Sequence, residues 1–380
     1  MAVAYNFYFD ILQPQYRVVL AFIIAALVNW YAIPVIIKIA KDKKLNEDPD
    51  SRMNHSSPIP NLGGLGIYAA IVSVSLTFIN TCGINSDGNN SSHLASLSPI
   101  IGGLTLIFFV GMKDDLIKTS AWKKLVIEFL ALFILVVIGD VRLDSMQGMF
   151  SIGVLRYRES VGLSILAGIV ITNAFKLIDG IDGLAASAAM LGCTVFGSYF
   201  IAIHQWEYAI FSFTVVGSLI PFLLYNAFGK TNKIFMGDTG SLILGFVLTL
   251  IIFRFNELHS MKVSGYKFVA APAFSFAVII LPLFDTIRVF ILRIYRNENP
   301  FKADRGHIHH ILLNLGFTHL QSTLILIVTS LAFIAFAYFF NFLGNSVLMY
   351  IMIPAAISLT MLASWLSRRK MEPDFKHMTD

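Results

Sequence analysis

The sequence predicts an all-α, polytopic integral membrane protein, and three observations lead to this fold class. Hydrophobic residues make up 56% of the 380-residue chain and charged residues only 13%, which is typical of membrane proteins. The hydrophobic residues are concentrated in runs of about 20, the length of helix that spans a hydrocarbon layer of about 30 Å. Glycines and polar residues separate the runs, and no basic stretch with interleaved aromatics indicates nucleic-acid binding.

Eleven apolar runs are long enough to be membrane spans, and we expect one helix in each. Their approximate bounds are 17–40, 62–81, 97–112, 122–141, 160–178, 184–204, 207–228, 239–256, 268–292, 320–341 and 346–366. The first run has no small-residue cleavage site ahead of a soluble domain, so we interpret it as a span rather than a signal peptide. No internal repeat divides the chain, and we expect a single membrane-embedded domain over residues 1–380.

The connecting loops alternate between two sides of the membrane, and the basic residues are divided unequally between those sides. Together with the adjoining span ends, one side receives 21 of the 28 lysines and arginines and the other receives 7. By the positive-inside rule the richer side is cytoplasmic. We therefore expect the amino terminus outside and the carboxyl terminus, with a tail at 367–380, in the cytoplasm. The acidic and histidine motifs all lie in cytoplasmic loops, which predicts a shared site there.

Two adjacent carboxylates, Asp114 and Asp115, directly follow an apolar run, and Lys124 lies ten residues after the first of them. Unpaired acids at a membrane boundary are costly, so a metal ion, a basic group or a proton-transfer role is needed to explain them. Carboxylates bind hard cations such as Mg²⁺, and lysine ammonium groups contact phosphate oxygens. The loop therefore indicates a site for a metal-bound phosphate or pyrophosphate, with a solvated loop as the alternative.

The next cytoplasmic loop also carries two acids, Asp179 and Asp182, each followed by a glycine. Asn173 lies about two helical turns before them. On a helix the two acids would share one face, because residues three apart are neighbours there. A simple turn between two spans is the alternative, but such a turn requires neither the asparagine nor both acids.

A third acidic loop follows Asn226 and reads Gly237-Asp238-Thr239-Gly240-Ser241, leading directly into an apolar run. Asp238 fits a helix N-cap. It also fits a hard oxygen ligand that would place Mg²⁺ beside a phosphate bound by the free N–H groups of the helix start. The two interpretations are compatible.

The longest cytoplasmic loop, 293–319, contains a histidine-rich segment. Its members are Arg305, His307, His309 and His310. The spacing is conceivable for zinc, but no cysteine is near and the context is rich in charge, which favours anion or nucleotide binding. A zinc site and a solvated loop with incidental histidines are the alternatives.

With these motifs in place, the chain resembles the polyprenyl-phosphate N-acetylhexosamine-1-phosphate transferases, glycosyltransferase family 4, over roughly residues 50–315. Asp114-Asp115 with Lys124, residues 173–184, residues 237–241 and residues 304–310 occur in the order of that family. The form His-Ile-His-His is similar to the UDP-N-acetylhexosamine branch rather than to the muramoyl-pentapeptide branch. Lys176 departs from the pattern, because many relatives have a second asparagine there.

The resemblance implies transfer of a sugar 1-phosphate from a UDP-N-acetylhexosamine to undecaprenyl phosphate, with release of UMP and a requirement for Mg²⁺ or, alternatively, Mn²⁺. It implies an enzyme of the bacterial inner membrane that initiates a cell-envelope polysaccharide, and it suggests a homodimer. Asp114, Asp115 and Asp238 are implied as catalytic acids, and Asp238 and Asn173 as metal ligands. The implied substrate contacts, the two uridine-side acids among them, are Lys124, Asn173, Asp179, Asp182, Asn226, Arg305, His307, His309 and His310.

The expected reaction is direct attack of a lipid phosphate oxygen on the β-phosphorus of the nucleotide sugar, with Asp115 or Asp114 removing any proton. A two-step route through an aspartyl intermediate stays open. The alternative functions are a UDP-MurNAc-pentapeptide transferase and, in a different class, an ion-coupled transporter, which predicts acids near mid-span and two related halves. An inactive relative would lack one of the motif acids, and none is missing.

Overall fold

The computed structural model describes residues 13–43, 45, 59–79, 91–229, 231–260, 268–295, 297 and 306–376. In this part of the chain the secondary structure is helical, without a β-strand, and an isolated bridge pairs Ser145 with Val154. The α-helices are α2 (Pro14–Asp42), α3 (Gly63–Ile79), α4 (Ser91–Leu116), α5 (Ala121–Phe133), α6 (Tyr157–Ile178), α7 (Leu184–Ala202), α8 (Trp206–Ala227), α9 (Gly237–Ser260), α10 (Ala271–Val278), α11 (Ile280–Tyr295), α12 (Ile308–Asn314), α13 (His319–Phe339) and α14 (Asn345–Lys376). The all-α prediction is confirmed.

Among the described residues, eight helices are long and apolar enough to cross a membrane, or nine if the bent pair α10 and α11 is one span. The apolar helix α3 is shorter, with 17 residues, and α5 continues into a π-helical turn at Ile134–Ile138. A helix lies in each of the eleven predicted runs. These observations confirm a polytopic membrane protein, whereas eleven crossings stay a prediction.

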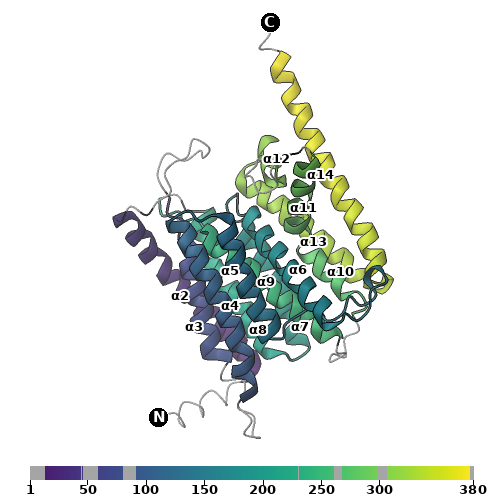
Figure 1. Cartoon of the computed structure of the whole chain (residues 1–380). Helices are drawn as coiled ribbons and strands as arrows, with labels where there is room; N and C mark the ends of the chain where they lie inside the picture. Colours follow the sequence, from purple (N-terminus) through teal and green to yellow (C-terminus); the bar gives the residue numbers. More distant parts are fainter. Residues whose placement is uncertain are drawn as a thin grey trace.

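Helix α9 forms the centre of the bundle (Figure 1). Within its most apolar stretch 94% of the residues are buried, compared with 33% in α2 and 28% in α14. It packs against α3, α4, α6 and α7, which requires apolar side chains on all sides of the helix. Because α9 is enclosed in this way, its first turn has a fixed position at one end of the bundle, and the acidic motif at 237–241 lies in that turn.

The predicted span at 268–292 is interrupted. Helices α10 and α11 meet at Ile279 with a bend of 77°. Pro282 lies in the first turn of α11, where it has no N–H to donate to a carbonyl of the preceding turn, and its ring would clash there. The apolar run continues through the bend without a polar residue. We therefore attribute the break in the helix to Pro282.

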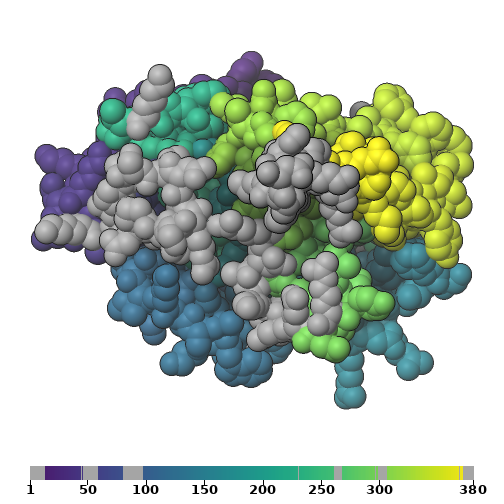
Figure 2. All heavy atoms as spheres, turned by 90° about the horizontal axis from the view of Figure 1, so that it is seen from above, coloured from purple at the N-terminus to yellow at the C-terminus, as the bar shows by residue number. Residues whose placement is uncertain are grey.

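The motif-bearing loops meet at one end of the bundle. In Figure 1 helix α2 begins at the bottom and helix α14 ends at the top. In Figure 2, which looks down on that upper end, the two helices lie on opposite sides of the molecule. At the upper end, Lys41 donates to the carbonyl of Thr231 (3.3 Å) and Lys370 donates to the carbonyl of Leu315 (2.7 Å). Helix α14 continues to Lys376, so the predicted tail at 367–380 is helical through that residue.

Candidate active site

The last turn of α4 contacts the first turn of α9, which brings two of the predicted acidic motifs together. A Cβ atom on Gly111 would lie 2.4 Å from Cα of Thr239, so only glycine permits this approach. Gly237 has φ +73°, a conformation that favours glycine, and a Cβ atom there would lie 2.6 Å from Oδ2 of Asp115. These glycines explain how Asp114 and Asp115 reach Asp238 although more than 120 residues separate them in sequence.

Asp115 holds the amino-terminal end of α9. Its Oδ1 accepts from the backbone N–H of Asp238 (2.7 Å), and its Oδ2 accepts from the N–H (3.0 Å) and the hydroxyl (2.5 Å) of Thr239. A carboxylate in this position satisfies N–H groups that have no partner within the helix, and it complements the helix dipole. The sequence predicted N–H groups free for a substrate anion at this helix start, but two of them donate to Asp115.

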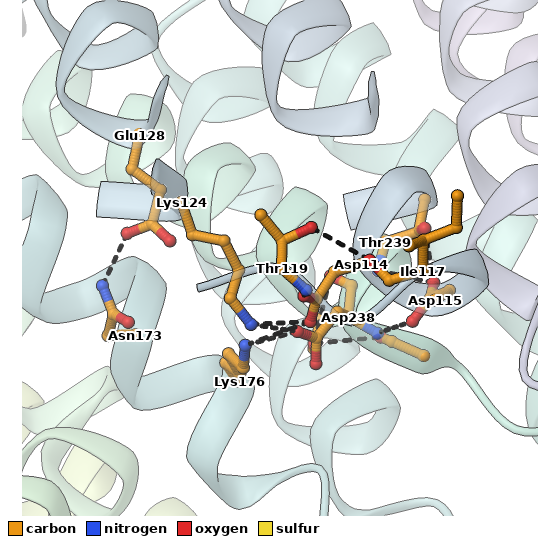
Figure 3. Close-up of polar contacts among 12 residues, drawn as sticks. Asp114, Asp115, Ile117, Thr119, Lys124, Glu128, Asn173, Lys176, Asp238 and Thr239 are labelled. Atoms are coloured by element: carbon orange, nitrogen blue, oxygen red, sulfur yellow. Dashed lines mark hydrogen bonds and ion pairs between the residues drawn. The ribbon is translucent and has the colours of Figure 1, made fainter. Parts of the chain in front are cut away.

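Asp238 itself points into a cluster of opposite charges (Figure 3). Nζ of Lys124, on α5, lies 2.6 Å from Oδ2 of Asp114 and 3.2 Å from Oδ2 of Asp238. Nζ of Lys176, on α6, contacts the same oxygen of Asp238 and lies 4.0 Å from Oδ2 of Asp114. The second carboxylate oxygen of Asp114 accepts from the N–H of Thr119 (2.7 Å). Four helices thus contribute two carboxylates and two ammonium groups to one place.

The donor set at this place fits a hard divalent cation. Among the described residues no three His, Cys, Asp or Glu side chains are grouped as ligands of one ion. However, Mg²⁺ in phosphoryl-transfer sites is typically held by one or two carboxylates, with substrate phosphates and water completing the shell. The facing oxygens of Asp114 and Asp238, which one lysine bridges, provide such a pair.

Asn173 lies on α6 near the cluster, and its side chain points toward Glu128 (Figure 3). The amide nitrogen donates to Oε2 of Glu128 (2.6 Å) and to the carbonyl of Ile169 (3.0 Å). Glu128 is 2% exposed and was not identified from the sequence, because a single acid in an apolar run carries no motif. The role of Asn173 as a ligand of the same ion as Asp238 stays a prediction.

Asp182 belongs to a second cluster. Helix α6 ends at Ile178, so Asp179 and Asp182 lie in a loop rather than on one helix face. Oδ2 of Asp182 accepts from Nζ of Lys233 (2.7 Å) and lies 3.0 Å from Nδ1 of His319. Burial raises the pKa of this carboxyl, but the hydrogen bonds from His319 and Lys233 outweigh burial and hold the pKa below its ordinary value.

Replacement of Asp182 by Asn tests the strength of this second cluster. We expect the variant to be less stable at neutral pH by about 1–3 kcal/mol, because two donors lose a charged acceptor. Since folding lowers the pKa of Asp182, its stabilising effect is complete above the unfolded value of about 3.9 and is lost as the pH falls through the folded value. The difference in apparent Tm between wild type and variant should therefore narrow below about pH 4. A difference that widens on acidification would contradict this assignment.

Asn226, a substrate contact implied by the family resemblance, connects two of the site loops. It is 5% exposed at the end of α8. Its Oδ1 accepts from the N–H of Gly183 (2.7 Å), and its Nδ2 donates to the carbonyl of Ile234 (2.9 Å). These bonds position the loop of Asp182 relative to the segment that leads to Asp238.

The histidine segment packs against the loop between α6 and α7. A Cβ atom on Gly180 would lie 2.4 Å from Nε2 of His309, so this imidazole lies directly on the loop. His309 is 1% exposed, and its ring nitrogens have no hydrogen-bond partner among the described residues. Burial, together with the neighbouring His310, lowers the pKa of His309 to about 3, so the ring is neutral. Burial and the carboxylates of Asp238, Asp115 and Asp182 raise the pKa of the adjacent Asp179.

His307 and His310, the other predicted histidine contacts, lie beside Asp285 and His309. Nδ1 of His307 lies 2.8 Å from Oδ2 of Asp285 on α11. The ring centroids of His309 and His310 are 4.3 Å apart. Arg305 lies outside the described residues. The partners Asp285, Lys233 and His319 were not identified from the sequence. Asp285 and His319 depend on the packing of α11 and α13, and Lys233 depends on the approach of the segment between α8 and α9 to the loop of Asp182, and none of these pairings has a local signature.

The central part of the chain, residues 97–256, matches the model of "Glycosyl transferase family 4". This segment contains the whole acid and lysine cluster. The sequence is also 31% identical over 325 residues to the "Probable undecaprenyl-phosphate N-acetylglucosaminyl 1-phosphate transferase" of Bacillus subtilis (strain 168), covering 83% of each chain. The chain belongs to glycosyl transferase family 4.

Two further bacterial proteins are similar to this chain over most of their length. The "Undecaprenyl-phosphate alpha-N-acetylglucosaminyl 1-phosphate transferase" of Escherichia coli (strain K12) is 27% identical over 305 residues, which is 78% of this chain and 77% of its own. The protein of the same name from Yersinia pestis is 27% identical over 308 residues. The resemblance stated from the motifs is thereby confirmed, and this family 4 transferase has its acidic motifs gathered at one end of the helical bundle.

Proposed function

We propose that this family 4 transferase moves N-acetylglucosamine 1-phosphate from UDP-N-acetylglucosamine to undecaprenyl phosphate, with release of UMP. The observation that supports the proposal most strongly is the cluster of Asp114, Lys124, Lys176 and Asp238 at the ends of four helices. It lies within the segment that matches the family model. The printed names of the similar bacterial proteins indicate both the lipid acceptor and the sugar.

The lysines address the main physical difficulty of this reaction. The lipid phosphate and the nucleotide diphosphate are both anionic, so their approach requires positive charge at the site of transfer. Lys124 and Lys176 lie between carboxylates that hold their ammonium groups in place. Phosphate oxygens of the two substrates would share these ammonium groups and gain charge compensation in a partly buried environment.

In the proposed reaction an oxygen of the lipid phosphate attacks the β-phosphorus, and the bond from that phosphorus to the bridging oxygen of UMP breaks. A phosphate monoester has a second pKa of about 6, so the acceptor is largely ionised at neutral pH and needs little help from a base. Asp115 uses both oxygens to hold the start of α9. We therefore assign Asp115 to positioning Asp238, and Asp114 to orienting Lys124.

Asp114 and Asp238 are the residues that would hold a divalent cation, Mg²⁺ or Mn²⁺. When bound, such an ion supplies charge neutralisation and a fixed orientation for phosphate oxygens. Both carboxylates already lie within reach of one ammonium group, so substrate phosphates entering here would meet both kinds of positive charge at the same point.

The location of the site belongs to the same proposal. Several described lysines of the basic loops, Lys41, Lys124 and Lys233, lie at the end of the bundle that carries the cluster, so we place this end in the cytoplasm. We further propose that the protein belongs to the bacterial inner membrane and forms a homodimer. The product would be a lipid-linked diphosphate sugar that initiates a cell-envelope polysaccharide. An ion-coupled transporter is not favoured, because Asp114 and Asp238 lie in terminal turns of α4 and α9 rather than at mid-span.

The proposed function is tested by incubating purified protein with undecaprenyl phosphate, Mg²⁺ and a panel of UDP-sugars. We expect release of UMP, matched in amount by the lipid-linked diphosphate sugar, with UDP-N-acetylglucosamine as the best donor. If UMP is released only with a different UDP-sugar, the assignment of N-acetylglucosamine as the transferred sugar is wrong. No release with any member of the panel would sink the proposal.

Lys176 provides a test of the proposed cation site that does not depend on activity. Its ammonium group contacts the oxygen of Asp238 that a cation would use. Replacement of Lys176 by Met removes a competing positive charge, so we expect the substrate-free protein to bind Mn²⁺ about tenfold more tightly, a gain of about 1.4 kcal/mol. The free Mn²⁺ concentration is measured by electron paramagnetic resonance.

The matched control is Lys233→Met, which removes an ammonium group from the second cluster and should leave Mn²⁺ affinity unchanged. Weaker binding of Mn²⁺ to the Lys176→Met protein, or equal gains in both variants, would contradict a cation site at Asp238.

A further inference from the structure

Asp285 is a buried carboxylate on α11 that the proposed reaction does not use. It lies in an apolar helix and is 1% exposed. Its Oδ2 lies 2.8 Å from Nδ1 of His307, and its Oδ1 accepts from the N–H of Ile308 (3.0 Å) and from Nη2 of Arg288 (2.7 Å). A carboxylate is not buried in this way without partners, and three donors satisfy it here.

The same contacts attach the histidine segment to α11. Nη2 of Arg288 also donates to the carbonyl of Gly306 (2.6 Å), so α11 contacts the backbone immediately before and immediately after His307. Asp285 therefore accepts from the first N–H of α12, and His307 is the N-cap residue of that helix. The backbone and the ring of His307 are fixed by one carboxylate.

The ring of His307 lies beside the ring of His309, which connects it to the rest of the site. The two rings are nearly parallel, at 7°, with centroids 5.7 Å apart. His309 lies on Gly180, beside Asp179, in the loop between α6 and α7. Because Nδ1 of His307 is engaged by Asp285, Nε2 is the ring nitrogen that remains for a substrate oxygen.

We propose that Asp285 is a positioning residue that fixes the orientation and the tautomer of His307, so that Nε2 contacts the diphosphate of the nucleotide sugar. The proposal rests on the proposed function, because it takes UDP as part of the substrate. A carboxylate that accepts from Nδ1–H of an imidazole determines which ring nitrogen is presented to the substrate. Asp285 acts through His307 and does not itself contact substrate.

The proposal is tested by the affinity of the full-length protein for UDP and for uridine, measured by calorimetry. Asp285→Asn is nearly isosteric, but its amide NH₂ would face Nδ1 and reverse the tautomer. We expect it to weaken UDP binding about tenfold, a loss typical of one charge-assisted hydrogen bond, and to leave uridine binding unchanged. His307→Gln should have a similar effect on UDP, and the double variant should bind UDP no more weakly than His307→Gln alone.

The matched control is Arg288→Gln, which removes a second partner of Asp285 and the contact with Gly306 but keeps the bond between Asp285 and His307. Its affinity for UDP should stay within about twofold of wild type, a much smaller change than the roughly tenfold loss expected for Asp285→Asn. Equal losses in Arg288→Gln and Asp285→Asn, or additive losses in the double variant, would show a merely structural role and overturn the proposal.

Two further results separate the possible failures. If the wild type binds no UDP, the proposed function fails and this inference fails with it, whereas normal UDP binding with an unaffected Asp285→Asn variant overturns the inference alone. If Asp285→Asn does not fold, the tautomer is measured directly in wild-type protein labelled with ¹⁵N-histidine. Nδ1 of His307 is expected to carry a proton, and Nδ1 without a proton would overturn the proposal.

Discussion

Replacement of Asp238 by Asn is expected to reduce kcat/KM for sugar-phosphate transfer by on the order of a thousandfold, comparable to the removal of one preorganised electrostatic group from an active site. The variant keeps the size of the side chain but removes the charge that holds Lys124 and Lys176. It also removes one of the two carboxylates proposed for the cation. The measurement is steady-state release of UMP with undecaprenyl phosphate and UDP-N-acetylglucosamine at saturating Mg²⁺.

The control for this prediction is Asp140→Asn, which removes a carboxylate that is 70% exposed and pairs with Arg142 in the loop that follows α5 and its π-helical turn. Asp140 has a positive φ of 49°, which asparagine tolerates well. The control should retain activity within about twofold, as expected for an exposed ion pair. Activity of Asp238→Asn within tenfold of wild type would mean that Asp238 is not part of the transfer site.

Asp115→Ala is expected to reduce both stability and activity, and this combination distinguishes a positioning role from a proton-transfer role. Two backbone N–H groups and one hydroxyl at the start of α9 lose their acceptor. Each unsatisfied buried donor costs about 1–3 kcal/mol, so the apparent Tm should fall by several degrees. Displacement of Asp238 by even about 1 Å should lower kcat/KM by about a hundredfold.

A graded control is available in Thr239→Val, which removes only the hydroxyl donor to Asp115 and leaves both backbone bonds. It should produce a smaller fall in Tm and in kcat/KM than Asp115→Ala. If Asp115→Ala lost activity but kept the Tm of the wild type, removal of a proton from the acceptor would become the better assignment for Asp115.

Much of the helical fold could be predicted from the sequence because each helix is signalled locally. Every predicted apolar run contains a helix. The alternation of loops between two sides predicted that the motif loops share one side, and their described parts are in contact at one end of the bundle. The break at Ile279 was not predicted, because the apolar run continues through Pro282. A hydrophobicity pattern gives no sign that proline lacks the backbone N–H that a continuous helix needs. The continuation of α14 beyond 366 was missed because the helix outlasts its apolar run.

Asp114, Asp115 and Asp238 were found from the sequence, but their individual roles were not, and Glu128 and Asp285 were not found. Asp114 and Asp115 are neighbours, yet one binds lysine and the other caps α9. These different roles depend on the direction in which each side chain points from the last turn of α4. Lys176 was noted only as a departure from the family pattern, and its contact with Asp238 depends on how α6 packs against α9.

The central claim is that Asp114 and Asp238 hold one divalent cation beside the diphosphate of the substrate. The most direct test is an experimental structure of the protein with UDP-N-acetylglucosamine and Mn²⁺, in which the metal is located by its anomalous scattering. We expect an anomalous peak at direct coordination distance from a carboxylate oxygen of Asp238 and of Asp114, in contact with phosphate oxygens. A peak bound by other residues, with Lys124 and Lys176 still paired to both acids, would contradict this claim.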